Sequence, residues 1–208
     1  MQKITLEVGN TTITTHNAML AHQVLEQETG LAMAIATLIP GEVATWAQCP
    51  PAIGQHWQGQ GGTYVGVMRG VNGQPDYHLI APKHAQIAEI TYGPRGKNID
   101  GASCARDGLA NTSALLASGT EHPAAQWAAD QEVDGHRDLY LPARAEAYLC
   151  WANIPEQFAD KGWWLTSTQY GPIIAWFQGF DDGYQDDGDG DGARPAFAVR
   201  RILIPSPL

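Results

Sequence analysis

The sequence predicts an α+β domain built from short antiparallel strands and two to three helices joined by long loops. Short runs of aromatic and β-branched residues recur along its C-terminal two thirds, which is typical of half-buried strands. Three apolar stretches begin near a capping residue or a proline and favour helices. The chain of 208 residues contains 23 glycines and 13 prolines, and so many turns argue against a helical bundle.

The N-terminal segment is predicted to hold a β-hairpin and one helix. Residues 1–15 alternate between apolar and polar side chains around a Gly-Asn turn, which favours a hairpin. Asn17 can cap a helix over 18–28. Residues 31–39 are almost entirely apolar, and we expect either a buried core element or, alternatively, an oligomer interface.

A Pro- and Gly-rich stretch at 40–62 is predicted to be a linker or irregular entry into the main domain. Trp46 and Trp57 are expected to attach it to that domain's surface. We therefore divide the chain into an attachment or oligomerisation segment, 1–58, and a main domain, 59–208.

The main domain is predicted to start with a hairpin and to continue through an irregular stretch into its helices. The predicted strands are 64–68, 77–80, 163–168, 173–177 and 197–203, the irregular stretch is 82–103, and the predicted helices are 109–118, 123–130 and 143–153. In the last helix Glu146 suits the positive N-terminal end, and Ala147, Leu149, Cys150 and Trp151 should face the sheet.

An acidic loop is predicted between the last two strands, at 181–192, with six aspartates and no basic residue. Asp187, Asp189 and Asp191 fit the first half of a calcium loop, D-x-D-x-D-G. The twelfth position is Ala198, where a bidentate Glu is expected, and no helices flank the run. We expect a solvated loop or one that contacts a cationic partner, with no cofactor; calcium is the alternative.

Composition and missing motifs argue against several functions. The net charge is −10 and the twelve basic residues are scattered, so nucleic acid is not an expected partner. The most apolar run, 31–40, is too short to span a bilayer, and no signal peptide pattern is seen, so synthesis in a bacterial cytoplasm without membrane insertion is expected. The three cysteines are expected to be reduced, and the seven histidines show no metal-ligand spacing. No nucleophile elbow, Walker loop or dinucleotide fingerprint occurs, so we expect no enzyme.

Five short motifs, taken in order, resemble the Lcl C-terminal domain family. They are HPAAQW (122–127), GHRDLYLPARAE (135–146), WWLTST (163–168), AWFQGFDDG (175–183) and AVRR (198–201). The resemblance covers roughly residues 60–204. It implies a C-type lectin-like fold, in which short strands and two helices hold long loops at one end.

The resemblance further implies a tail-associated adhesin of a bacteriophage or prophage, because such proteins occur in this family. The expected partners are a host cell-surface receptor, glycan or protein, and other virion tail proteins. A homo-oligomer, with a trimer as one candidate, would raise avidity for a repetitive surface. The alternatives are a baseplate or other virion component that makes only subunit contacts, and an enzyme related to formylglycine-generating enzymes. The enzyme would need a reactive cysteine pair near the end of the chain, which nothing after Cys150 supplies.

Recognition is expected to depend on the turns near the C-terminus. Loops 168–172 and 181–194 would contact the ligand, through Tyr170, Tyr184, Asp186, Asp187, Asp189 and Asp191. Trp163, Trp176 and Phe197 stand at strand positions and are assigned to the fold, although the two indoles are large enough to stack on sugars. Arg200 and Arg201 are expected to pair with acidic residues.

Overall fold

The computed structural model divides the chain into two compact units, residues 1–49 and residues 50–208. It describes residues 4–8, 11–15, 50–94, 96–158, 162–172, 174–189 and 192–205. In the smaller unit β1 (Ile4–Val8) and β2 (Thr11–Thr15) form the predicted antiparallel hairpin, in which Ile4 is opposite Thr15. The predicted helix over 18–28, the apolar run 31–39, Trp46 and Cys49 lie outside the described residues.

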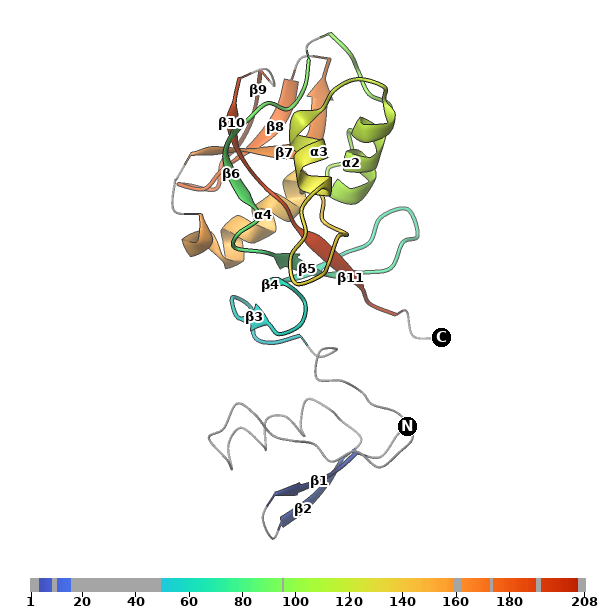
Figure 1. Cartoon of the computed structure of the whole chain (residues 1–208), viewed down its shortest axis with the longest axis vertical. Coiled ribbons are helices and arrows are strands. Elements are labelled where there is room, and N and C mark those ends of the chain that lie inside the picture. Colours follow the sequence, from blue (N-terminus) through green and yellow to red (C-terminus); the bar gives the residue numbers. More distant parts are fainter. Residues whose placement is uncertain are drawn as a thin grey trace. The chain divides into compact units, whose positions relative to one another are not determined.

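The larger unit is an α+β domain whose described strands form three small sheets (Figure 1). One sheet has the order β11-β5-β4-β3, the second pairs β10 with β6, and the third has the order β7-β8-β9. All the pairings are antiparallel. The strand bounds are β3 (His56–Trp57), β4 (Gly62–Met68), β5 (Tyr77–Ala81), β6 (Gln86–Ile90), β7 (Trp163–Gly171), β8 (Ile174–Gly179), β9 (Gln185–Asp189), β10 (Arg194–Phe197) and β11 (Arg200–Leu203).

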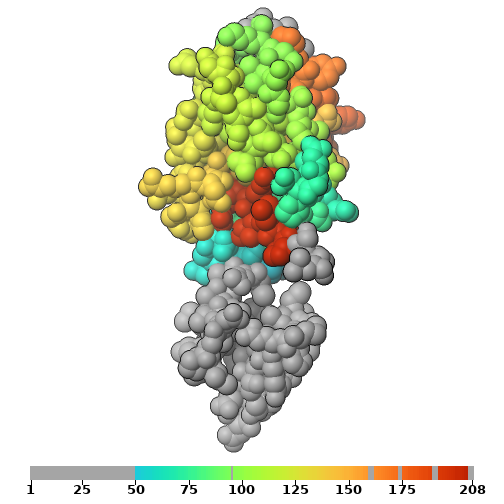
Figure 2. Space-filling view, turned by 90° about the vertical axis from the view of Figure 1, so that its right-hand side faces the viewer, coloured from blue at the N-terminus to red at the C-terminus, as the bar shows by residue number. Residues whose placement is uncertain are grey.

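The three predicted helices are confirmed as α2 (Gly108–Ala117), α3 (Pro123–Ala129) and α4 (Arg144–Asn153). Asp107 caps α2 by accepting a hydrogen bond from the Ala110 amide at 3.0 Å, and Pro123 occupies the first turn of α3. Figure 2 shows the face of this unit formed by α2, α3 and neighbouring segments (green to yellow), with the C-terminal strand (red) reaching the surface below them.

Several strands lie where the sequence predicted irregular structure. The predicted linker contains β3, which pairs with β4, and Trp57 is 2% exposed rather than a surface anchor. The stretch 82–103 contains β6. The single strand expected at 197–203 is two strands, and each joins a different sheet. The acidic stretch is also not wholly a loop, because five of its residues form β9 on the edge of β8.

Three buried clusters are seen among the described residues of the larger unit, two large ones and a small one of Trp57, Tyr64 and Ile80. One is aromatic: Phe158 stacks on Phe180 with ring centroids 3.8 Å apart, and the edges of Trp164 and Phe197 meet this pair. The second lies beneath α2 and α3 and contains Leu115, Leu141, Leu165 and Phe177. Trp164 and Phe197 are therefore core residues, whereas Trp163, which the sequence assigned to the core, is 37% exposed.

Glu146 is fully buried and receives four hydrogen bonds from three separate segments of the chain. Its Oε1 accepts from the hydroxyls of Tyr77 at 2.6 Å and Tyr140 at 2.7 Å. Its Oε2 accepts from the backbone amides of Ala143 at 2.7 Å and Gly108 at 3.1 Å. Burial raises the pKa of Glu146, whereas the bonds from Tyr77, Ala143 and Tyr140 act in the opposite direction.

Gly108 is required for this arrangement. A Cβ on this residue would lie 2.5 Å from the Ala143 amide nitrogen and would also contact the Glu146 carboxylate. No side chain larger than hydrogen fits between the starts of α2 and α4. The carboxylate thus joins the two helix N-termini to β5 and to Tyr140, whose amide pairs with Val199 near the end of the chain.

The long connection from β6 to α2 is fixed to β7 by two buried amide side chains. Asn111 accepts from the Cys104 amide at 2.9 Å, donates to the Cys104 carbonyl at 2.7 Å and donates to Ser167 at 3.2 Å. Gln169 accepts from the Ile99 amide at 2.7 Å and donates to the Lys97 carbonyl at 2.8 Å. These side chains satisfy part of the backbone of this connection, alongside backbone hydrogen bonds such as the one from the Gln169 amide to the Ala102 carbonyl at 2.8 Å.

Both arginines of the AVRR motif make the expected pairs with acidic residues. Arg200 binds Asp138 at 2.9 Å, and Arg201 binds Asp107 at 3.0 Å. Arg201 also lies over the ring of Tyr77, one of the donors to Glu146. Within the described ranges, no helix has the length and apolar character needed to cross a bilayer.

We expect Glu146→Gln to destabilise the domain by about 2–4 kcal/mol. Each carboxylate oxygen accepts from two donors, so the amide nitrogen of the new side chain would face a donor at either position. Urea unfolding measures the change, with Glu132→Gln on the surface as control. Equal unfolding midpoints for the two variants would contradict the proposed role of Glu146.

His122 is a buried histidine from which we expect a pH dependence of the domain's stability. Its side chain is buried at the start of α3, Nδ1 lies 3.2 Å from the Tyr92 carbonyl, and Nε2 has no hydrogen-bond partner in the described part of the chain. Burial lowers the pKa of His122 below 6.5, although the hydrogen bond to Tyr92 opposes this shift. The neutral ring is therefore the folded form.

We expect the free energy of unfolding to fall as the pH drops below about 6.5, because the unfolded chain takes up a proton there before the folded chain does. His122→Gln should reduce this dependence, and the exposed His84→Gln should not. Denaturation midpoints between pH 5 and pH 8 measure the effect. The same slope in wild type and His122→Gln would exclude His122 as its source.

Candidate ligand-binding surface

Trp176 is the centre of an aromatic and charged strip on one face of the β7-β8-β9 sheet. The ring of Tyr170 meets it edge-on, with centroids 5.3 Å apart and an interplanar angle of 86°. The guanidinium carbon of Arg144 lies 3.7 Å from the Trp176 ring centroid, which is a cation–π contact. The Trp176 strip is defined as Trp176, Tyr170, Arg144, Gln185 and Asp187.

Arg144 is held in place from both ends. Its Nε donates to the Gln185 Oε1 at 3.0 Å, and the Gln185 Nε2 donates back to the Arg144 carbonyl at 2.6 Å. Its backbone amide donates to the Thr168 hydroxyl at 3.1 Å. A cation in the first turn of a helix is disfavoured by the helix dipole, so these contacts and Trp176 offset an unfavourable position.

Asp187 lies directly across from Trp176 in the β8–β9 ladder and is half-buried. Cross-strand partners lie on the same face of a sheet, so a carboxylate borders the indole. Asp186 is opposite Phe177, is exposed, and belongs to the other face. The sheet thus separates two aspartates that the sequence placed in one site.

The two predicted contact tyrosines lie near opposite ends of β8. Tyr170 is 60% exposed close to the β7–β8 turn, whereas Tyr184 is 70% exposed in the β8–β9 turn. In the latter turn Asp182 accepts from the Tyr184 amide at 3.0 Å. Gly183 has a φ of +80°, and a Cβ there would lie 2.5 Å from the Trp151 ring, so this turn packs tightly against α4.

The predicted calcium run has an extended backbone in its first part. Asp187 and Asp189 belong to β9 and pair with β8, whereas a calcium loop must curl to bring its oxygens together. Asp191 lies outside the described residues. In the described part of the chain, no group of three or more His, Cys, Asp or Glu side chains is placed to hold a metal ion.

Sequence reasoning missed Arg144 and Gln185. Arg144 is the first residue of a helix, a position that gives no hint of a distant aromatic partner, and Gln185 was taken for part of a loop. Trp176 was assigned to the fold but is only half-buried. Aromatic residues fall on both faces of β8, so alternation alone does not reveal which face is open.

A scan against protein-family models finds no match for this chain, and a search of curated proteins finds no similar sequence.

The structure separates aromatic residues of the buried core from those exposed at the surface. Trp164→Ala should cost about 3–5 kcal/mol of unfolding free energy, because this indole is 3% exposed in the aromatic core. Tyr170→Ala should cost less than about 1 kcal/mol, since its ring makes a single edge contact at the surface. Chemical denaturation compares the two variants, and similar costs would contradict this division.

Proposed function

We propose that this protein is a non-enzymatic recognition protein of the Lcl C-terminal type, with a C-type lectin-like fold. In this proposal it is a tail-associated adhesin of a bacteriophage or prophage virion and binds a host surface structure through the Trp176 strip. The observation that carries the proposal is the strip itself, an exposed aromatic surface bordered by a fixed cation, an amide and a carboxylate.

The topology supports the lectin-like part of the proposal. The unit combines short antiparallel strands, three helices and long connections, and β11 near its end pairs with β5 of the first hairpin. The motifs behind the family resemblance also serve the fold. WWLTST supplies the buried Thr166, Ser167 and Thr168, and AVRR supplies the two paired arginines. Loop positions are consequently free to vary while these contacts hold.

The chemistry of the strip supports recognition of a sugar or a similar polar ligand. Tyr170 offers an open ring for stacking, and Arg144, Gln185 and Asp187 offer donors and acceptors at its border. Arg144 and Gln185 are already held by hydrogen bonds to each other, so their side chains lose little conformational freedom when a ligand binds. Several copies on one tail would raise avidity for a repetitive host surface.

Tyr170→Ala and Asp187→Asn should each lower binding to host cells or envelope fractions at least tenfold, because each removes a group of the strip while the fold remains. Tyr148→Ala is the matched control, since Tyr148 is 47% exposed on α4 outside the strip. Pull-down with purified protein measures the effect, with and without a chelator to test calcium.

Retention of full binding by Tyr170→Ala would exclude the strip. A protein that binds no host fraction but binds a neighbouring virion subunit would instead favour a baseplate or other structural role.

A further inference from the structure

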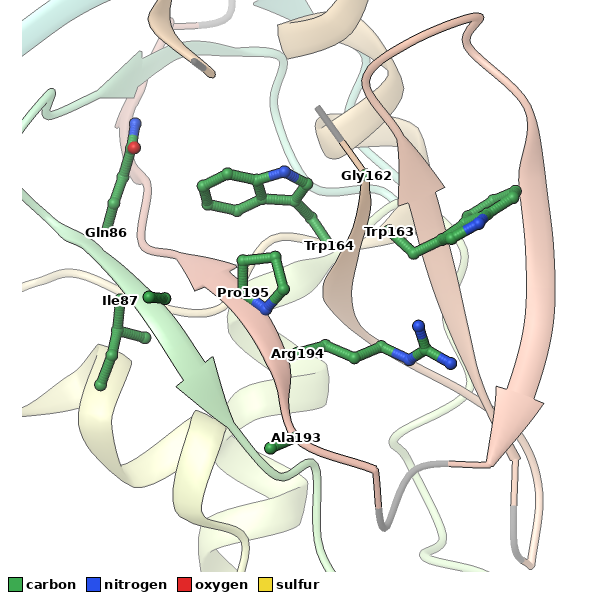
Figure 3. A pocket seen from close by; sticks show the side chains of 9 residues that line it. Gln86, Ile87, Gly162, Trp163, Trp164, Ala193, Arg194 and Pro195 are labelled. Carbon is green, nitrogen blue, oxygen red and sulfur yellow. The ribbon is translucent and has the colours of Figure 1, made fainter. Parts of the chain in front are cut away.

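A hollow of about 390 Å³ opens where β6, the start of β7 and β10 meet (Figure 3). Trp163 and Arg194 line it, together with residues of β6 such as Gln86 and Ile87. Its volume lies within the range of about 300–1,000 Å³ typical of small-molecule sites. The hollow is separate from the Trp176 strip.

Among the described residues, Arg194 has no acidic partner of the kind that Arg200 and Arg201 have. Arg200 and Arg201 each bind an aspartate, but no ion pair among the described residues includes Arg194. Its Nε is buried and donates to no acceptor in the described part of the chain. The guanidinium carbon lies 4.6 Å from the Phe177 ring centroid, so the cation makes a cation–π contact with the face of this ring.

Trp163 lies beside this cation on the same face of β8. It pairs with Gly179, and a Cβ on that glycine would lie 3.4 Å from the indole. Gly179 and Phe177 are two residues apart on β8 and therefore share one face. Figure 3 shows the Trp163 and Arg194 side chains running in the same direction from β7 and β10.

The geometry points to a binding site for a carboxylated sugar residue in this hollow. The guanidinium of Arg194 would bind the carboxylate through a charge-assisted contact. The partly exposed indole of Trp163 would stack on the sugar ring. Asp186 is exposed on the same face of the neighbouring strand, so its charge opposes the binding of any anion and most strongly that of one with several negative charges.

This site does not depend on the proposed function. Trp176 and Phe177 are adjacent in β8 and lie on opposite faces, so the strip and the hollow can be tested separately. Tyr170→Ala should leave binding at the hollow unchanged even where it abolishes binding of host fractions.

The test uses the full chain and glucuronate as probe, with titration calorimetry as the measurement. Glucose, which has the same ring without a carboxylate, and inorganic phosphate, which has charge without the ring, are the comparison ligands. Glucuronate should bind saturably and at least tenfold more tightly than either. Arg194→Met should weaken glucuronate at least tenfold, and Arg137→Met, at a surface arginine, should change nothing.

A second measurement needs no variant that threatens the fold. In the wild-type protein the indole N–H resonance of Trp163, assigned by its absence in Trp163→Phe, should shift with glucuronate and not with glucose. Absence of saturable glucuronate binding, equal affinity for phosphate, or an unmoved Trp163 resonance would each overturn the proposal. Undiminished binding by folded Arg194→Met would do the same.

Discussion

The buried carboxylate of Glu146 is the interaction on which the rest of the larger unit depends. A charged or polar group without solvent is tolerated only when its hydrogen bonds are complete, and here four donors surround one side chain. Those donors come from a strand, an extended segment and the starts of two helices. The hydrogen bonds of Glu146 fix the start of α4. Arg144 lies two residues before Glu146, so these bonds also determine its position and, with it, the position of the Trp176 strip.

An arginine from another element covers an aromatic ring on each face of β8, and the two arginines are held differently. Arg144 covers Trp176 and is bound reciprocally by Gln185, whereas Arg194 covers Phe177 without a hydrogen-bond partner for its Nε. Arg144 is thus fixed by side-chain hydrogen bonds, whereas Arg194 makes no ion pair within the described ranges. Successive side chains of any strand point to opposite faces of the sheet. One short strand therefore contributes to two distinct surfaces.

Local patterns predicted the three helices and the first hairpin, since capping residues, prolines and turn signals act over a few residues. The strand β9 was missed because aspartate and glycine disfavour strands; pairing with β8 along its whole length overrides that propensity. Glu146 was expected at a helix start, but no spacing in the sequence shows that Tyr77, 69 residues away, donates to it. Arg144 and Trp176 were missed as a pair for the same reason, because their contact is set by the packing of α4 on the sheet.

The pairing of β10 with β6 and of β11 with β5 has a consequence for synthesis. Two of the three sheets of the larger unit include a strand made after residue 193, although their partners are complete by residue 90. During synthesis, more than a hundred further residues must therefore be added before β5 and β6 can pair with β11 and β10, and until then each strand has an unpaired edge. Contacts of such long sequence separation also slow folding. Chaperone capture of nascent chains is thus an expected feature of this protein's biogenesis, and it follows from topology alone.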